Sequence, residues 1–136
     1  MRVAVTLPIR LVSEANSHTH WRERQKRAKE QRLAAEMSLR AAVRNMRGRL
    51  VLNPWIPTIL VVTITRIAPR ALDSDNAVGS AKHIRDGVAD ALGVNDRDPR
   101  VEWVVRQRKS DGHAMPSVPA YAVEIVIEAA KPTEAT

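Results

Sequence analysis

The chain has 136 residues, the size of a single domain, and its 22 Lys and Arg outnumber its 15 Asp and Glu to give a formal net charge of +7. It contains no cysteine, which excludes disulfides and cysteine-based zinc or redox sites and indicates a reducing, cytoplasmic setting. The first apolar run, residues 3–11, is broken by Pro8 and Arg10 and is shorter than the ~20 residues of a membrane span, so we expect a soluble protein without membrane contact. The excess of cations favours nucleic acid as a partner, because clustered Lys and Arg release counterions condensed on phosphates.

Two elements are expected before residue 50. Apolar residues occupy every second position of residues 3–11, the period of a strand with one buried face, and Pro8 places this strand at an edge or an end of its sheet. From about His20 to Met46 the apolar residues recur at spacings of three, four and seven, which predicts a long helix. Gly48 is its expected stop, and a connector follows.

The remaining elements predict an α/β (α+β) fold. Residues 58–67 are apolar on both faces, which indicates a central strand covered on both sides, and a second helix is expected from Asp75 to Gly93. Alternation over residues 101–106 and 121–127 predicts two more strands. The order β-α-β-α-β-β gives a single domain, residues 1–130, with a mixed four-stranded sheet covered by two helices. Residues 131–136 are expected to be a disordered tail.

Acidic residues gather between Arg70 and Trp103. Asp73 and Asp75 are two apart as the chain leaves the central strand, so in an extended segment both carboxylates face the same way, and a hard divalent cation would relieve their repulsion. We expect the strand after Asp98 to lie beside the central strand and to bring this third carboxylate to the same end. The structural alternatives are a helix N-cap at Asp75 and an ordinary turn at Asp98.

Lys82, Asp86 and Asp90 are four residues apart and therefore line one face of the second helix. Two interpretations remain open for them. They form ion pairs on a solvated surface, or Lys82 points toward the metal and steadies the scissile phosphate.

These residues resemble the RusA-type Holliday junction resolvases, small endonucleases of phages and bacteria. The family pattern is a strand, D-x-D-N opening a helix, a lysine within it, D-A-L near its end and an aspartate before the next strand. Here residues 73–76 read DSDN, Lys82 follows, residues 90–92 read DAL, and Asp98 precedes PRVEW. The segments VTLPIRL and SEAN near the start and AVEIVIE near the end also match, so the resemblance covers nearly the whole chain.

The resemblance implies a homodimer that nicks branched DNA, with Mg²⁺ (or Mn²⁺ as a substitute) activating a water against the phosphodiester. It implies Asp73, Asp75 and Asp98 as metal ligands and as catalytic residues together with Lys82. The family lysine usually stands four residues after the second aspartate, where this chain has Gly79, and the second helix carries the extra residues HIRDGVADAL. Asp96 competes with Asp98 for the place of the third ligand.

The long helix is expected to hold the DNA backbone through its basic residues. The candidates are Arg22, Arg24, Lys26, Arg27 and Lys29. Each of them would also suit a simple solvated face. Trp21 or Trp55 would either stack on an unpaired base or pack in the core. The histidines are scattered and supply no clear general base.

Two other functions fit the same residues. The first is a nucleic-acid-binding protein on this scaffold that has lost catalysis, with the displaced lysine as its mark. The second is an interaction protein of a phage replication or packaging module, whose basic helix docks on an acidic partner.

Overall fold

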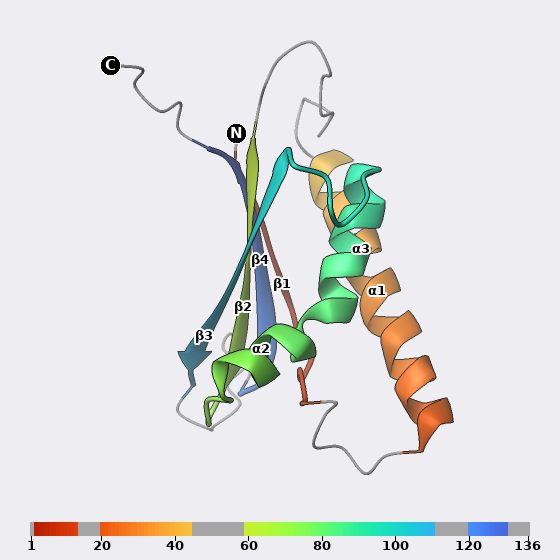
Figure 1. Ribbon diagram of the computed structural model, residues 1–136, viewed down its shortest axis with the longest axis vertical. Coiled ribbons are helices and arrows are strands. Elements are labelled where there is room, and N and C mark those ends of the chain that lie inside the picture. The colour runs from red at the N-terminus through yellow and green to blue at the C-terminus, as the bar shows by residue number, and fades with distance from the viewer. Residues whose placement is uncertain (1, 14–19, 45–58, 111–119, 131–136) are drawn as a thin grey trace.

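The computed structural model describes residues 2–13, 20–44, 59–110 and 120–130, and all structural statements concern these residues. Seven elements follow in chain order: β1 (Arg2–Leu7), α1 (Trp21–Arg44), β2 (Leu60–Ala68), α2 (Ser74–Ser80), α3 (Lys82–Leu92), β3 (Val101–Lys109) and β4 (Ala122–Ala129). Figure 1 shows the two longer helices, α1 and α3, side by side against the sheet. The stop at Gly48, the connector, Trp55, His18, His113 and the tail at residues 131–136 lie outside the described residues.

The four strands form one mixed sheet in the order β1-β4-β2-β3. The strand β4 runs antiparallel to both of its neighbours, whereas β2 and β3 are parallel, with Leu60 opposite Val101 and Ala68 opposite Lys109. The predicted α+β class, the mixed four-stranded sheet and the central place of residues 60–68 are confirmed. The strand β1 lies at an edge and ends at Leu7, directly before Pro8, as the missing N–H of proline requires.

The helical segment after Asp73 differs from the prediction because it forms two helices instead of one. The chain breaks at Ala81, whose N–H donates to the carbonyl of Val78, three residues back. The hydroxyl of Ser80 donates to the carbonyl of Ala77 at 2.7 Å and competes there with the helical backbone bond. A glycine–serine pair is a common site for such a kink. As a result α2 points in a different direction from α3 (Figure 1).

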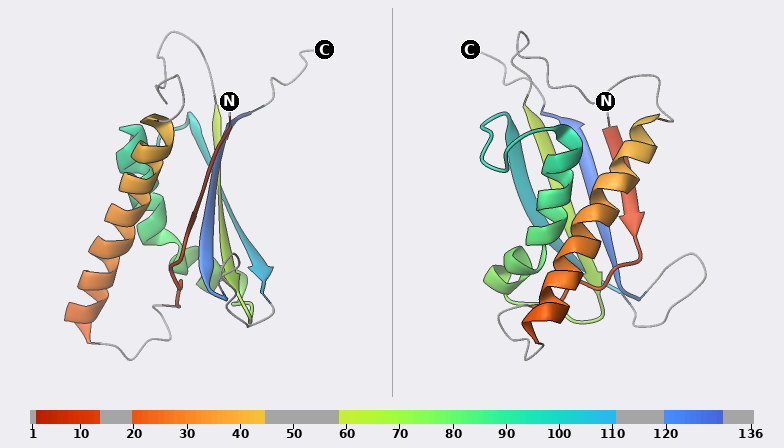
Figure 2. Two further views of the ribbon diagram at one scale, coloured as in Figure 1. Left: turned by 180° about the vertical axis from the view of Figure 1, so that it is seen from behind. Right: turned by 90° about the vertical axis from the view of Figure 1, so that its right-hand side faces the viewer.

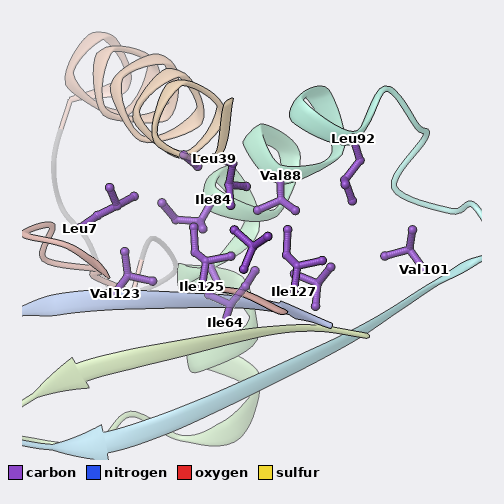
Figure 3. Packing of buried hydrophobic residues seen from close by; sticks show 14 of the residues in the cluster. Leu7, Leu39, Ile64, Ile84, Val88, Leu92, Val101, Val123, Ile125 and Ile127 are labelled. Carbon is purple, nitrogen blue, oxygen red and sulfur yellow. The ribbon is translucent and has the colours of Figure 1, made fainter. Parts of the chain in front are cut away.

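The hydrophobic core lies between the sheet and the pair α1 and α3. Alternate residues of the strands, such as Ile64, Ile125 and Ile127, pack against Leu39 of α1 and Val88 of α3 (Figure 3). Both long helices lie on this one face of the sheet (Figure 2). The expectation that the central strand is covered on both sides is therefore wrong along part of its length. On the opposite face Val61 and Thr63 remain half-buried.

The helices α1 and α3 touch at Gly87. A Cβ at this position would come within 2.2 Å of the carbonyl oxygen of Arg32 and within 2.8 Å of the Cβ of Ala35. One turn further along, the guanidinium of Arg32 donates two hydrogen bonds to the carboxylate of Asp90. This bidentate pair raises the pKa of Arg32 and lowers the pKa of Asp90. No helix in the described part of the chain is both long and apolar enough to cross a bilayer.

Replacing Gly87 by alanine should destabilise the protein, because the new methyl group must push α1 away from α3. We expect a loss of about 1–3 kcal/mol in the free energy of unfolding, the usual cost of overpacking. Gly79→Ala is the matched control, because beyond its chain neighbours and its own helix backbone no atom lies within 4 Å of the position that its new Cβ would take. The control should be neutral or gain about 0.5–1 kcal/mol from reduced chain entropy. Urea denaturation of both variants checks the prediction, which fails if the two show equal midpoints.

Candidate metal and nucleic-acid site

Asp73 and Asp75 lie where β2 gives way to α2, and both are exposed. Asp73 occupies the N-cap position of α2 but makes no side-chain capping hydrogen bond, and Asp75 stands in the first helical turn. Because Ser74 is already helical, the segment is not extended as expected, and Asp75 is not the N-cap. Within the described residues neither carboxylate is engaged in a hydrogen bond or an ion pair. Both are therefore available to a ligand.

The backbone that leads to Asp73 is fixed by the side chain of Gln107 on β3. Its amide nitrogen donates to the carbonyl of Leu72 at 2.7 Å, and its amide oxygen accepts from the N–H of Leu72 at 2.8 Å. The buried guanidinium of Arg66 donates to the carbonyls of Leu11 and Arg70. Burial lowers the pKa of Arg66, and the neighbouring charge of Arg10 lowers it further. The turn between β2 and α2 is thus held from two sides.

Asp98 does not join this pair within one chain, and the expectation that it does is wrong. The parallel pairing of β2 and β3 puts the end of β2 and the start of β3 at opposite ends of the sheet. Leu72 is bound beside Gln107, while the carbonyl of Asp98 accepts from the N–H of Val101. Six residues of strand separate these two points, which corresponds to about 20 Å. A single ion cannot bridge that distance.

The carboxylate of Asp98 is occupied by Arg100. It accepts one hydrogen bond from the Arg100 backbone N–H at 2.9 Å and two from the guanidinium, at 3.0 and 2.7 Å. These bonds, the side-chain bonds first, lower the pKa of Asp98 to about 2. The bond to the N–H two residues ahead forms an Asx turn. Within one chain, Asp98 is therefore a turn residue, which was the alternative to a metal ligand.

Asp96, unlike Asp98, lines a hollow that α2 also borders. The hollow, of about 270 Å³, lies between α2, α3 and β3, and Val78, Lys82 and Asp86 also line it. Residues 75, 78 and 79 are three and four apart, so Asp75 stands on the face of α2 that borders this hollow. The backbone carbonyl of Asp96 is fixed by the side chains of Arg85 and Trp103.

Lys82, Asp86 and Asp90, predicted to line one face of the second helix, do not share one environment. Lys82 is exposed in the first turn of α3, and together with Asp86 it borders the hollow. Asp90 turns instead to α1, where it pairs with Arg32. The position of the family lysine, Gly79, also borders the hollow. Lys82 therefore borders the same hollow as Gly79, the position at which the family has its lysine.

No group of three or more His, Asp or Glu side chains in the described part of the chain is arranged to hold a metal ion. Asp73 and Asp75 nevertheless have the chemistry that Mg²⁺ prefers, since both are unengaged oxygen donors at an accessible place. Mg²⁺ usually binds through one or two carboxylates and completes its shell with water and phosphate oxygens. The pair thus fits a substrate-bridging ion better than a closed protein cage.

The predicted phosphate-binding residues cluster in the first turns of α1. Four of them are exposed and Arg27 is half-buried: the set is Arg22, Arg24, Lys26, Arg27 and Lys29. The contact of Lys26 with Glu30 is loose at 3.9 Å. Further along α1, Arg40 is bound to Glu36 at 3.1 Å. The start of α1 lies at the same end of the molecule as α2 (Figures 1 and 2).

Gln107→Leu should loosen the turn that carries Asp73. The substitution keeps the size of the side chain but leaves the N–H and carbonyl of Leu72 without partners, which costs about 1–3 kcal/mol. We expect a lower urea midpoint and faster hydrogen exchange at the Leu72 amide. Gln25→Leu, at an exposed position of α1, is the control and should change neither. The two hydrogen bonds between the Gln107 amide and the Leu72 backbone together form the Gln107 clasp. Unchanged exchange at Leu72 in the Gln107 variant would contradict the role of this clasp.

Asp98→Asn should destabilise the protein only where the carboxylate is ionised. The folded-state pKa of about 2 lies below the ordinary value of 3.8, so the stabilisation is fully present above about pH 4. It is lost as the pH falls toward 2, because both states then bind the proton. Thermal melts of the wild type and the variant at several pH values should converge over this range. A gap that persists undiminished at the acid end would show that the charge of Asp98 contributes nothing.

Comparison with known proteins finds similarity to an uncharacterized protein. The chain is 39% identical over 100 residues to an uncharacterized protein of Xylella fastidiosa (strain Temecula1 / ATCC 700964), a match that covers 67% of this chain and 60% of that protein. The chain thus spans less than two thirds of the length of that relative. No protein-family model and no solved structure matches the chain.

Proposed function

We propose that this protein is a Mg²⁺-dependent endonuclease that nicks branched DNA. The observation that carries the proposal is the arrangement at one end of the sheet. Asp73 and Asp75 are exposed and unengaged there. Helical spacing puts Asp75 on the same side of α2 as Val78 and Gly79, which line the hollow together with Lys82 and Asp96. The basic start of α1 lies at the same end (Figure 1). A hard cation and a polyanion would therefore meet at this end.

Each residue has a distinct task in this proposal. Asp73 and Asp75 would hold the cation, and the Gln107 clasp keeps the backbone before them in place. Lys82 contributes positive charge beside the scissile phosphate, where it stabilises the developing negative charge. A bound divalent cation supplies a more acidic water and Lewis-acid stabilisation of the phosphate. The first turns of α1 hold the flanking phosphates without reading sequence.

The third carboxylate has two possible sources. Asp96 lines the hollow in the same chain, and we propose that it joins Asp73 and Asp75 only when cation and substrate are bound, since the described residues hold no preformed group of three carboxylates. Asp98 is held about 20 Å away at the start of β3, so it reaches the site only if a second copy supplies it. A homodimer suits branched DNA for an independent reason. A four-way junction is two-fold symmetric, and its resolution takes two matched nicks.

Asp75→Asn tests the site directly. We expect Mg²⁺-dependent nicking of a synthetic four-way junction to fall by roughly two orders of magnitude, since a transition-state contact is removed. Junction affinity in a gel-shift titration should be unchanged or tighter, because a negative charge beside the phosphate disappears. Glu102→Gln, an exposed acid on β3, is the control and should leave nicking unchanged. Loss of binding in step with nicking would refute the metal assignment.

The same assay distinguishes the two carboxylates. Asp96→Asn should reduce nicking, whereas Asp98→Asn should retain it. If Asp98→Asn is inactive, a mixture of the Asp75 and Asp98 variants decides where Asp98 acts. Activity regained on mixing would mean that a second copy supplies Asp98, because one site of the mixed dimer is then intact. Junction binding without any nicking by the wild type would leave the non-enzymatic binding protein.

A further inference from the structure

Trp21 is an exposed aromatic residue at the start of α1. It retains 56% of its accessible surface, which excludes the expectation that it packs in the core. The other described tryptophan, Trp103, is half-buried under Arg85 and donates its indole N–H to the carbonyl of Asp96. Tryptophan is highly buried on average. Trp21 instead presents more than half of its surface to solvent at the start of the helix, where another molecule can reach it.

The neighbours of Trp21 are another ring and a cation. The ring of His20 lies 5.6 Å away, centroid to centroid, at an interplanar angle of 33°. The guanidinium of Arg22 lies 5.4 Å from the centre of the indole. Residues 20–30 carry five Lys and Arg and only two glutamates, Glu23 and Glu30. This charge disfavours a basic protein as the partner and favours a polyanion.

We propose that Trp21 is a stacking platform for an unpaired base of a nucleic-acid strand held by the start of α1. Aromatic side chains within a cationic surface bind single strands in this way, because every base offers a π-face and the phosphates are neutralised alongside. The proposal rests on the nucleic-acid binding proposed above. It adds a preference for unpaired over fully paired substrate, which phosphate contacts alone do not give.

The position of Trp21 gives this preference a use. The start of α1 and the start of α2 lie at the same end of the molecule in both directions of view (Figures 1 and 2). A strand whose base is stacked on Trp21 therefore passes the end that carries Asp73 and Asp75. In a fully paired duplex the bases are stacked on each other, so the indole can engage only a terminal or opened position. Branch points and single-stranded stretches offer such bases.

The test compares Trp21→Ala and Trp21→Phe with two controls on the same helix, Leu33→Ala and Met37→Ala, whose side chains are similarly exposed at 57% and 59%. Fluorescence anisotropy with labelled poly-dT and with blunt duplex of equal length gives both affinities. We expect Trp21→Ala to bind poly-dT roughly tenfold more weakly, the usual effect of removing one stacking partner. Its duplex affinity should change less than about twofold. Trp21→Phe should recover most of the loss, and the controls should bind like the wild type.

Several outcomes separate this inference from the proposed function. Unchanged poly-dT affinity in Trp21→Ala, or an equal loss for duplex and poly-dT, would overturn the stacking role while leaving nucleic-acid binding in place. Wild-type protein that binds neither ligand would overturn both. Binding with the expected selectivity but without Mg²⁺-dependent nicking would support the stacking role and refute only the nuclease. Quenching of the intrinsic fluorescence by poly-dT in the wild type, reduced in Trp21→Phe, would support direct contact.

Discussion

The parallel pairing of β2 and β3 determines where the candidate site residues of this protein lie. Two neighbouring parallel strands need a connection that returns the chain to the end from which it started. Here α2 and α3 provide it, so residues that follow β2 and residues that precede β3 lie at opposite ends of the sheet. Asp73 and Asp75 belong to the first group and Asp98 to the second. These aspartates are therefore close in sequence but lie at two opposite ends of the sheet.

Sequence patterns predicted the strands and the long helix well, because each depends on local periodicity. The period-two pattern predicted over residues 3–11 matches β1 only as far as Leu7, and the pattern over residues 121–127 matches β4. Alternate residues of both strands face α1 and α3. The break at Ala81 was not predicted, since Val78, Ala81 and Val88 keep a helical spacing across it. It depends on the Ser80 hydroxyl, which finds the carbonyl of Ala77 only in the folded backbone.

For the candidate site, the structure tests where the predicted residues lie relative to one another. The spacing of Asp73 and Asp75 indicated a shared end, and the structure leaves both carboxylates open at the start of α2. The direction of β3 relative to β2 is not written in any local pattern, so the place of Asp98 was predicted wrongly. The Gln107 clasp escaped notice because the residues that it joins are 35 apart. The sequence did contain one indication that the turn after β2 is held by side chains. Arg66 interrupts an apolar strand, and a buried arginine needs several hydrogen-bond acceptors.

The contact at Gly87 fixes the position of α1 relative to α3. Because the α3 backbone rests directly on the α1 backbone there, and Arg32 grips Asp90 one turn away, the two helices have little freedom to slide or separate. The basic first turns of α1 and the hollow bordered by Lys82 therefore keep a fixed position relative to each other. Under the proposed function, a strand bound by both would meet a spacing that the protein sets in advance, so the nucleic acid would be the partner that bends.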